Sequence, residues 1–345
     1  MRGDRRRLVT GVGVSAAGAA LYGPRVSRGQ AAVEKQRAGR DLSSIKQQIF
    51  DLFSDLPDRK AFKIWAPESN SGAEVLIQLN AQRRMFVAST LKSVILCERL
   101  RQLDSRGIEK RLREHELPLN ESIWSPGRAI FNPPDLAGRV SERTAMEAMI
   151  VHSDNTATDM VLKEAGADAV RSFIASIGLK KTMIPDSTRV FGAYLAGARN
   201  YKTITWSELI SLPQGPLAHP FLNNVETLAS SAEDLVSFFS RALQGSFFSH
   251  RETLFQFKRI LQLGDINYLV PFPLGFSALG KAGYADVPGS HARSIAGGVY
   301  FPNRWVYFSM VLNWDAAAGE DPATERAFYG AIRKSIVLLQ RHLRD

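Results

Sequence analysis

Apolar positions recur with a helical period over long parts of the chain. Residues 41–56 place apolar side chains three or four positions apart and are followed by Pro57, so this segment predicts an amphipathic helix that ends there. The closing segment, residues 322–343, has the same period and begins at Pro322, a residue favoured at the first helical position. Between them the pattern predicts five more helices, at residues 91–103, 141–153, 156–166, 169–178 and 231–244.

Near both ends the pattern switches to alternation or to short continuous apolar runs, which is typical of strands. Two such runs flank the turn-like residues 68–72 and predict a hairpin. The predicted strands are residues 61–67, 73–80, 278–284, 293–301 and 304–314. This order predicts an α/β plus all-α fold, in which a five-stranded antiparallel sheet is flanked by the N- and C-terminal helices and a helical domain is inserted. We expect a ligand cleft where the two halves meet.

The first thirty-one residues read as a signal rather than as part of the fold. Residues 4–23 combine charged residues with a moderately apolar run and small residues, and they resemble a twin-arginine export signal. The run is too short and too rich in Gly and Ala to leave a stable membrane span. We expect cleavage after Ala31, with Ala19 as the other candidate, and therefore an exported periplasmic or extracellular protein that uses the twin-arginine machinery. The alternative is a disordered basic arm.

Charge and metal-ligand spacing narrow the classes of function. The formal charge is +10, but six arginines and one aspartate give the first thirty residues +5, and no later run interleaves Lys and Arg with aromatic residues. A nucleic-acid partner is therefore not expected.

Cys97 is the only cysteine, so no intrachain disulfide can form, and its apolar surroundings predict a buried structural thiol. The six histidines are never within five residues of each other, which predicts no metal and no cofactor.

The strongest chemical signal is a hydroxyl and an amine at the start of an apolar helix. Ser89 and Lys92 are three positions apart, which places both side chains on one helical face. A lysine that is desolvated in a pocket can lose its proton and activate an adjacent serine as a nucleophile. The pattern alone is weak, because Ser43 and Lys46 repeat it on the N-terminal helix, where a surface position explains it.

Two further motifs follow in order along the chain. Ser153 and Asn155 lie with an aspartate between them at a junction between two helical patterns, 64 residues after Ser89, where a hydroxyl and an amide can project into a cleft. Lys281 precedes an alanine and Gly283 in a strand pattern, where it supplies positive charge while the glycine lets a substrate backbone approach.

Together the three motifs resemble the signature of the penicillin-recognising serine hydrolases, and the segments FVASTLK and SDNTATDMVL look most like class A β-lactamases. The resemblance spans most of the chain. It implies a β-lactamase/transpeptidase-like fold with a discontinuous sheet domain, residues 32–86 plus 275–345, and an inserted helical domain, residues 87–274. The active-site cleft would lie between them.

The resemblance also implies roles for individual residues. Ser89 would be the nucleophile that becomes acylated, Lys92 its base, Ser153 a proton relay toward the leaving nitrogen, and Asn155 would orient Lys92 and the substrate amide. The backbone N–H groups of Ser89 and Tyr284 would form an oxyanion hole.

Residues of the strands predicted at 278–284 and 293–301 would bind substrate. Lys281 would supply electrostatic stabilisation, and Arg293 on the next strand would pair with a substrate carboxylate. Gly283 and Ala282 would line the same strand edge as substrate-binding residues.

Departures from the family pattern concern release of the acyl group. Class A β-lactamases carry a glutamate a little over thirty residues past the Ser-Asp-Asn motif, but residues 165–207 contain no Glu; Thr188 falls near that position, with Asp186 as the closest carboxylate. Ala282 replaces the hydroxyl residue usual after the strand lysine. The spacing from the second motif to the third is also longer than typical, which predicts an insertion around residues 193–224.

These observations predict an exported serine hydrolase that a β-lactam or related amide acylates at Ser89, with slow deacylation. Three alternatives remain: a D-alanyl-D-alanine peptidase, an esterase-like hydrolase of the same fold, and a non-catalytic binder of β-lactams or muropeptides. In each, the ligand is a small β-lactam or a peptidoglycan-derived peptide.

Overall fold

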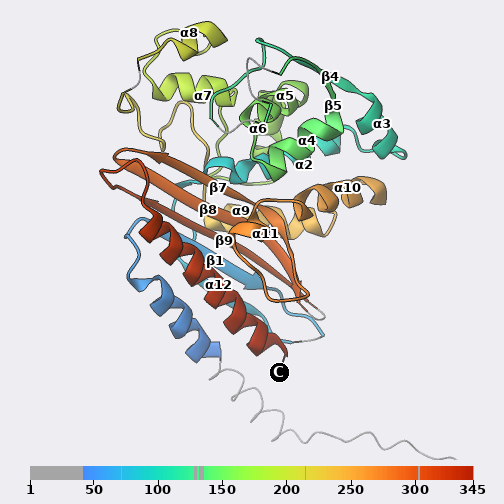
Figure 1. Ribbon diagram of the computed structural model, residues 1–345. Helices are drawn as coiled ribbons and strands as arrows, with labels where there is room; N and C mark the ends of the chain where they lie inside the picture. The colour runs from blue at the N-terminus through green and yellow to red at the C-terminus, as the bar shows by residue number, and fades with distance from the viewer. Residues whose placement is uncertain are drawn as a thin grey trace, which may run out of the picture. The chain divides into compact units, whose positions relative to one another are not determined.

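A five-stranded antiparallel sheet with the order β2-β1-β9-β8-β7 joins the two ends of the chain (Figure 1). Its strands are β1 (Lys60–Ala66), β2 (Val75–Leu79), β7 (Ala278–Val287), β8 (Ser290–Phe301) and β9 (Arg304–Trp314). The N-terminal hairpin pairs with the C-terminal strands through β1 and β9, in a register that sets Ile64 opposite Phe308. The computed structural model describes residues 42–70, 72–127, 130–131, 136–213, 215–301 and 304–344. The predicted signal and its cleavage sites lie outside these ranges.

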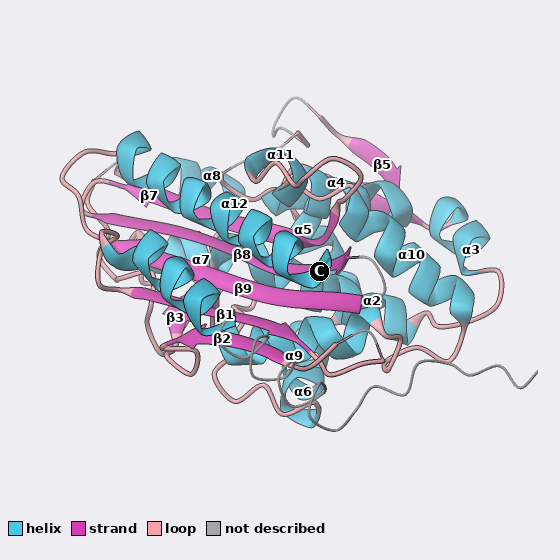
Figure 2. Cartoon of the chain, turned by 90° about the horizontal axis from the view of Figure 1, so that it is seen from below, coloured by secondary structure: helices cyan, strands magenta, loops and turns pink. Residues whose placement is uncertain are grey.

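Two helices cover one face of the sheet, residues 42–54 and α12 (Pro322–Arg344) (Figure 2). Strand alternation supplies the apolar surface: Phe62 and Ile64 of β1 face these helices, whereas Ala61 faces the other way. Phe53 packs against Phe62 with ring centroids 4.8 Å apart and meets Phe328 of α12 edge to face at 6.4 Å. The predicted sheet and its two flanking helices are thereby confirmed.

The helical layer on the opposite face is built around α2 (Lys92–Gln102), which is buried over most of its length. The same layer contains α3 (Ile108–Glu114), α4 (Glu142–Val151), α5 (Asn155–Ala165), α6 (Ala167–Ser176), α9 (Ala232–Leu243) and α10 (Arg251–Gln262). The short α11 (Ile266–Leu269) packs against β7 instead, and its Ile266 joins the core that α12 covers. Cys97 of α2 is fully buried as predicted, and burial raises the pKa of its thiol. None of the described helices is long and apolar enough to cross a membrane.

The segment predicted as an insertion has a small core of its own. It contains the end of α7 (Thr188–Leu195) and α8 (Trp206–Ile210), and Ala193, Ile204 and Leu209 form a separate hydrophobic cluster there. Two short ladders complete the fold: β3 (Met85–Phe86) with β6 (Ala229–Ser230), and β4 (Glu116–Leu119) with β5 (Gly138–Ser141). The first ladder holds the chain just before Ser89.

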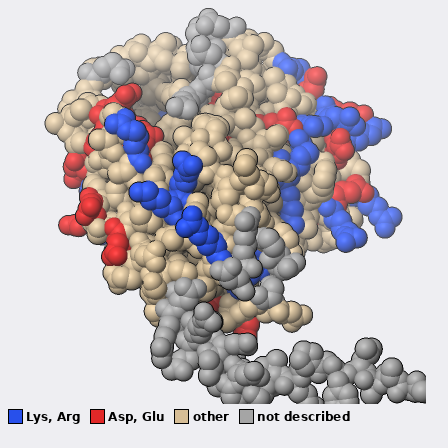
Figure 3. All heavy atoms as spheres, turned by 60° about the horizontal axis from the view of Figure 1, so that its bottom comes forward, with Lys and Arg blue, Asp and Glu red and all other residues tan. Residues whose placement is uncertain are grey.

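Charges of both signs share the molecular surface. Figure 3 shows one face, on which a row of Lys and Arg crosses the centre while Asp and Glu lie beside basic side chains toward the edges. The surface of this face is therefore mixed in charge rather than uniformly basic.

Candidate active site

Ser89 lies in a tight turn that strand β8 holds in place. It belongs to the 3₁₀ helix η1 (Ala88–Leu91), and the preceding Ala88 has φ +47°, a left-handed conformation that is costly for a residue with a side chain. Strand β8 fixes this turn, because Ser294 Oγ donates to Val87 O at 2.6 Å and lies 2.6 Å from Thr90 Oγ1. Thr90 and Ser294 were not predicted as site residues, since only the fold brings them together.

Strand β7 approaches the same turn so closely that one position must be glycine. A Cβ on Gly283 would lie 2.9 Å from Ser89 N and closer still to Val87 O. Both neighbours are backbone atoms, which cannot move aside as a flexible side chain could. Gly283 therefore lets β7 pack edge-on against the residue expected to be the nucleophile.

Lys92 is the first residue of α2 and is fully buried behind Ser89. Its Nζ donates to Ser153 O at 2.6 Å and to Asn155 Oδ1 at 2.8 Å, and lies 3.5 Å from Ser153 Oγ. Ser89 Oγ is not among the hydrogen-bond partners of Nζ in the described chain. The amine is thus directed at the second motif rather than at the neighbouring hydroxyl.

The surroundings of Lys92 favour its uncharged form. Burial and, after it, the positive charge of Lys281 lower the pKa of Lys92 to about 7, against the opposing charges of Asp154, Asp159 and Asp265. Near neutral pH a large fraction of this amine can therefore accept a proton.

The second motif is a strained turn that caps α5. Ser153 has φ +56°, and the Asp154 carboxylate accepts from Ala157 N at 2.7 Å and from Phe131 N at 2.9 Å. Asn155 bridges two parts of the site, because its Oδ1 accepts from Lys92 and its Nδ2 donates to Pro126 O at 2.7 Å. Asp154 therefore builds the turn that presents its two neighbours.

Lys281 is fully buried in β7 and forms an ion pair with Asp265. Its Nζ also donates to Ala282 O at 2.7 Å, while the second oxygen of Asp265 accepts from Ala282 N at 2.9 Å. Lys281 acts on the site through its charge, which reaches Lys92. Asp265 was not predicted, because a single aspartate before the short helix α11 carries no sequence signal.

Arg293 is held by two carboxylates. Its Nη1 donates to Asp286 Oδ1 at 2.9 Å and its Nη2 to Glu325 Oε2 at 3.0 Å, and its side chain is 5% exposed. Burial alone would lower the pKa of Arg293, but the hydrogen bonds to Glu325 and Asp286 outweigh it and raise the pKa well above its ordinary value. The guanidinium group that we expect to bind a substrate carboxylate is therefore already paired with two carboxylates of the protein.

A cleft of about 490 Å³ brings together residues of the first two motifs with residues of β7 and β8 that follow the third. Its wall contains five of the predicted residues, Ser89, Ser153, Asn155, Tyr284 and Arg293. The rest of the wall is Gly127, Tyr268, Leu269, Ala285, Asp286, Glu320, Pro322 and Glu325. The other predicted residues are not part of this wall: Lys92, Lys281, Ala282 and Gly283. Ala282 is buried in the core on the face of the sheet covered by α12.

Thr188 begins α7 and is committed to bonds within the protein. Its N and Oγ1 donate to Asp159 Oδ1 at 2.6 and 2.8 Å, and its Oγ1 lies 2.6 Å from Ser125 Oγ. Burial raises the pKa of Asp159, and the hydrogen bonds from Thr188 and Arg189 oppose this shift. Neither Thr188 nor Asp186 is in the cleft wall.

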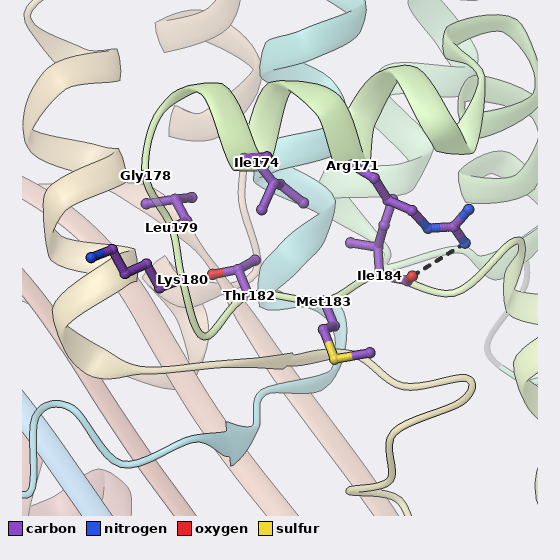
Figure 4. Close-up of a pocket in the computed structure, with 9 residues that line it drawn as sticks. Arg171, Ile174, Gly178, Leu179, Lys180, Thr182, Met183 and Ile184 are labelled. Atoms are coloured by element: carbon purple, nitrogen blue, oxygen red, sulfur yellow. Dashed lines mark hydrogen bonds between the residues drawn. The ribbon is translucent and has the colours of Figure 1, made fainter.

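A second pocket, of about 500 Å³, lies beneath α6 and has a different character (Figure 4). Ile174, Leu179 and Met183 give it an apolar lining, and Arg171 at its edge donates to Ile184 O at 3.4 Å. It shares no residue with the cleft and contains none of the predicted site residues. Of these two pockets, only the cleft is lined by predicted site residues.

Comparison with known proteins agrees with this geometry. The family described as "Beta-lactamase enzyme family" matches residues 44–333. A β-lactamase from Streptomyces lavendulae is 28% identical over 186 residues, which are 53% of this chain and 56% of that protein. The match thus spans little more than half of the curated relative.

Solved structures share the fold at lower identity. The TLA-3 extended-spectrum β-lactamase superposes with a TM-score of 0.67 at 15% identity, covering 88% of this chain and 100% of that one. A class A β-lactamase from Bacteroides cellulosilyticus gives 0.65 at 19% identity (87% and 99% covered), and PBP-A gives 0.62 at 19% (87% and 97%). The fold is β-lactamase/transpeptidase-like, and with nearly all of its described length matched by the family, the chain belongs to the β-lactamase enzyme family.

Proposed function

We propose that this protein is a serine hydrolase of the β-lactamase type that a β-lactam or related amide acylates at Ser89. The observation that carries the proposal is the state of Lys92: a fully buried amine with a pKa of about 7, bonded to Ser153 and Asn155, behind a wall that contains Ser89. A base of this pKa is matched to proton transfer near neutral pH.

In the acylation step, the uncharged Lys92 accepts the proton of Ser89 Oγ as that oxygen bonds to the substrate carbonyl carbon. This requires Nζ to turn from Ser153 O toward Ser89, a tightening that accompanies substrate binding in many enzymes. The C–N bond then breaks, and the proton passes from Lys92 through Ser153 Oγ, 3.5 Å away, to the leaving nitrogen.

The developing oxyanion would be stabilised by the N–H groups of Ser89 and Tyr284, each worth about 3 kcal/mol. The close packing of β7 at Gly283 brings these two backbone segments together. Lys281, buried with Asp265, adds positive potential from behind the strand.

Release of the acyl group is proposed to be slow. The position expected to carry a general base holds Thr188, whose hydroxyl bonds to Asp159 and lies against Ser125 instead of facing the cleft. Loss of a general base costs on the order of 10² to 10⁴ in rate. The acyl-enzyme would therefore accumulate.

The bonding of Thr188 within the protein also favours a second candidate. This is a D-alanyl-D-alanine peptidase or esterase-like hydrolase that a β-lactam inhibits by slow release. Here Lys92 or Ser153 would serve both half-reactions with the natural substrate. A non-catalytic β-lactam or muropeptide binder differs from both, since Ser89 would not turn over any acyl donor. Export through the predicted signal would bring either hydrolase to cell-wall peptides.

The test is to mix the protein with a reporter cephalosporin and follow product release and intact mass together. We expect a burst of about one equivalent followed by slow turnover, with a covalent adduct that Ser89→Ala abolishes. Ser43→Ala, which disrupts the repeat of the motif on the N-terminal helix, is the matched control and should retain the burst. Rapid steady turnover without any adduct would refute slow release, and no adduct with any acyl donor would refute the hydrolase.

A further inference from the structure

Four aromatic side chains form a continuous row at the end of the sheet away from the cleft. The rings follow one another as Tyr300, Trp305, Tyr307 and Trp65, with centroid separations of 5.4, 5.9 and 5.9 Å. Trp305 and Tyr307 are nearly parallel, with 7° between their planes, and Tyr300 is 53% exposed. Tyr307 is buried in the core and Trp65 and Trp305 are half-buried against it, so the row runs from the exposed ring of Tyr300 into the core and leaves parts of both tryptophan rings at the surface.

These rings border a pocket of about 460 Å³. Its other lining residues are mostly polar or small: Pro67, Ser69, Ser240, Arg241, Gln244, Ser246 and Arg304. None of them is acidic, and none belongs to the cleft. Arg293 and Tyr300 are seven residues apart on β8, so the two sites are separated by roughly 23 Å.

Arg304 is a buried cation with no carboxylate partner in the part of the chain that the structure describes. It is 5% exposed, and its Nη2 donates to the carbonyl oxygens of Ala66, Pro67 and Ala73 at 3.1, 2.8 and 2.9 Å. Within the described residues, its Nε has no hydrogen-bond partner and no carboxylate is within ion-pair distance. The three carbonyls explain how the side chain is held, but they leave its charge uncompensated, which is costly in a buried position.

Arg241 places a second cation in the same wall. Its Nη2 donates to Ile177 O at 2.8 Å and its guanidinium lies over the Phe247 ring at 5.4 Å. Gln244 contributes a carboxamide whose Nε2 donates to Tyr307 Oη at 2.6 Å. The pocket therefore combines aromatic faces, two arginines and several groups that can both donate and accept hydrogen bonds.

We propose that this pocket binds an anionic saccharide. The C–H face of a sugar ring would stack on the aromatic row, whose faces carry partial negative charge. A carboxylate on the sugar would pair with Arg304, for which guanidinium geometry is well suited, with Arg241 beside it. The hydroxyls would bond to Gln244 and the serines. This site is separate from the proposed hydrolase and does not depend on Ser89.

The test uses the full-length protein and two matched probes, tri-galacturonic acid and its fully methyl-esterified form. Binding is followed by tryptophan fluorescence and by saturation-transfer NMR. We expect saturable binding of the acid and affinity weaker by about tenfold for the uncharged ester. Ser89→Ala should bind the acid as the wild type does.

Three variants separate the proposed site from other effects. Trp305→Ala and Arg304→Gln should each weaken binding of the acid by about tenfold. Because Arg304→Gln also removes the bonds to the β1–β2 turn, Tyr300→Ala at the exposed rim provides a variant that leaves those bonds intact and should also weaken binding. Arg333→Gln on α12 removes the same charge elsewhere and should change nothing.

Several outcomes would overturn the proposal. These are no saturable binding of the acid by the wild type, equal binding of acid and ester, or wild-type affinity in both Trp305→Ala and Tyr300→Ala. Loss of binding in Arg333→Gln equal to that in Arg304→Gln would also overturn it, since attraction by net charge would then explain the result.

Discussion

Arg293 Nη2 donates a 3.0 Å hydrogen bond to Glu325 Oε2, which joins β8 to α12 at the wall of the cleft. A substrate carboxylate that uses Arg293 must compete with this partner and with Asp286. An anionic acyl donor should therefore bind this cleft more weakly than it would bind a cleft in which the arginine had no carboxylate partner.

Glu325→Gln should therefore speed acylation by a β-lactam that bears a carboxylate. We expect up to about fivefold, because a partly exposed ion pair is worth up to about 1 kcal/mol and its loss frees the guanidinium. The measurement is the second-order rate of adduct formation by mass spectrometry. Glu320→Gln removes a cleft carboxylate that is not bonded to Arg293, so an equal gain in both variants would point to general repulsion and contradict the specific role of Glu325.

The pH dependence of acylation should report the amine of Lys92. The reactive form is the uncharged one, so the rate should be low below pH 6 and rise through a midpoint near 7, where the pKa of Lys92 lies. A rate independent of pH between 6 and 9 would exclude Lys92 as the base.

The charge of Lys281 should set where that midpoint falls. Because Lys281 lowers the pKa of Lys92, its removal should move the midpoint above 7. The variant to use is Lys281→Met combined with Asp265→Asn, since Lys281→Met alone would leave a buried carboxylate unpaired. The loss of Asp265 opposes the shift, because that carboxylate raises the pKa of Lys92, but Lys281 has the larger influence and the midpoint should still rise. Normalised rate profiles separate this shift from any fall in the maximum rate, and an unchanged midpoint would show that the charge of Lys281 does not outweigh that of Asp265.

The sequence predicted the sheet and the flanking helices because each strand and helix carries its own apolar period. It also predicted five of the residues that line the cleft. It could not predict the partners of Lys281 and Arg293, because Asp265 and Glu325 become neighbours only when the fold brings α11 and α12 against the sheet. Strain at Ala88 was equally hidden, since no residue pattern marks a left-handed alanine.

Restoring a carboxylate at the start of α7 should accelerate release of the acyl group. Thr188→Glu alone would set two carboxylates side by side, because Thr188 Oγ1 lies 2.8 Å from Asp159 Oδ1. Combined with Asp159→Asn, it should raise the deacylation rate by about tenfold or more, as expected for a regained general base. Thr188→Gln with Asp159→Asn is the isosteric control, and equal deacylation in the two double variants would show that the carboxylate has no role.

Gly283→Ala should block acylation while leaving the fold intact elsewhere. The added Cβ would lie 2.9 Å from Ser89 N, so β7 must move away from the turn and the two proposed oxyanion donors must separate. Loss of one such donor costs about 10² to 10³ in rate. Gly330→Ala on α12 is the matched control, because its Cβ meets nothing within 4 Å and should leave acylation unchanged. If Gly283→Ala acylates at the wild-type rate, with the same unfolding temperature, then contact between β7 and the Ser89 turn does not position the reacting groups.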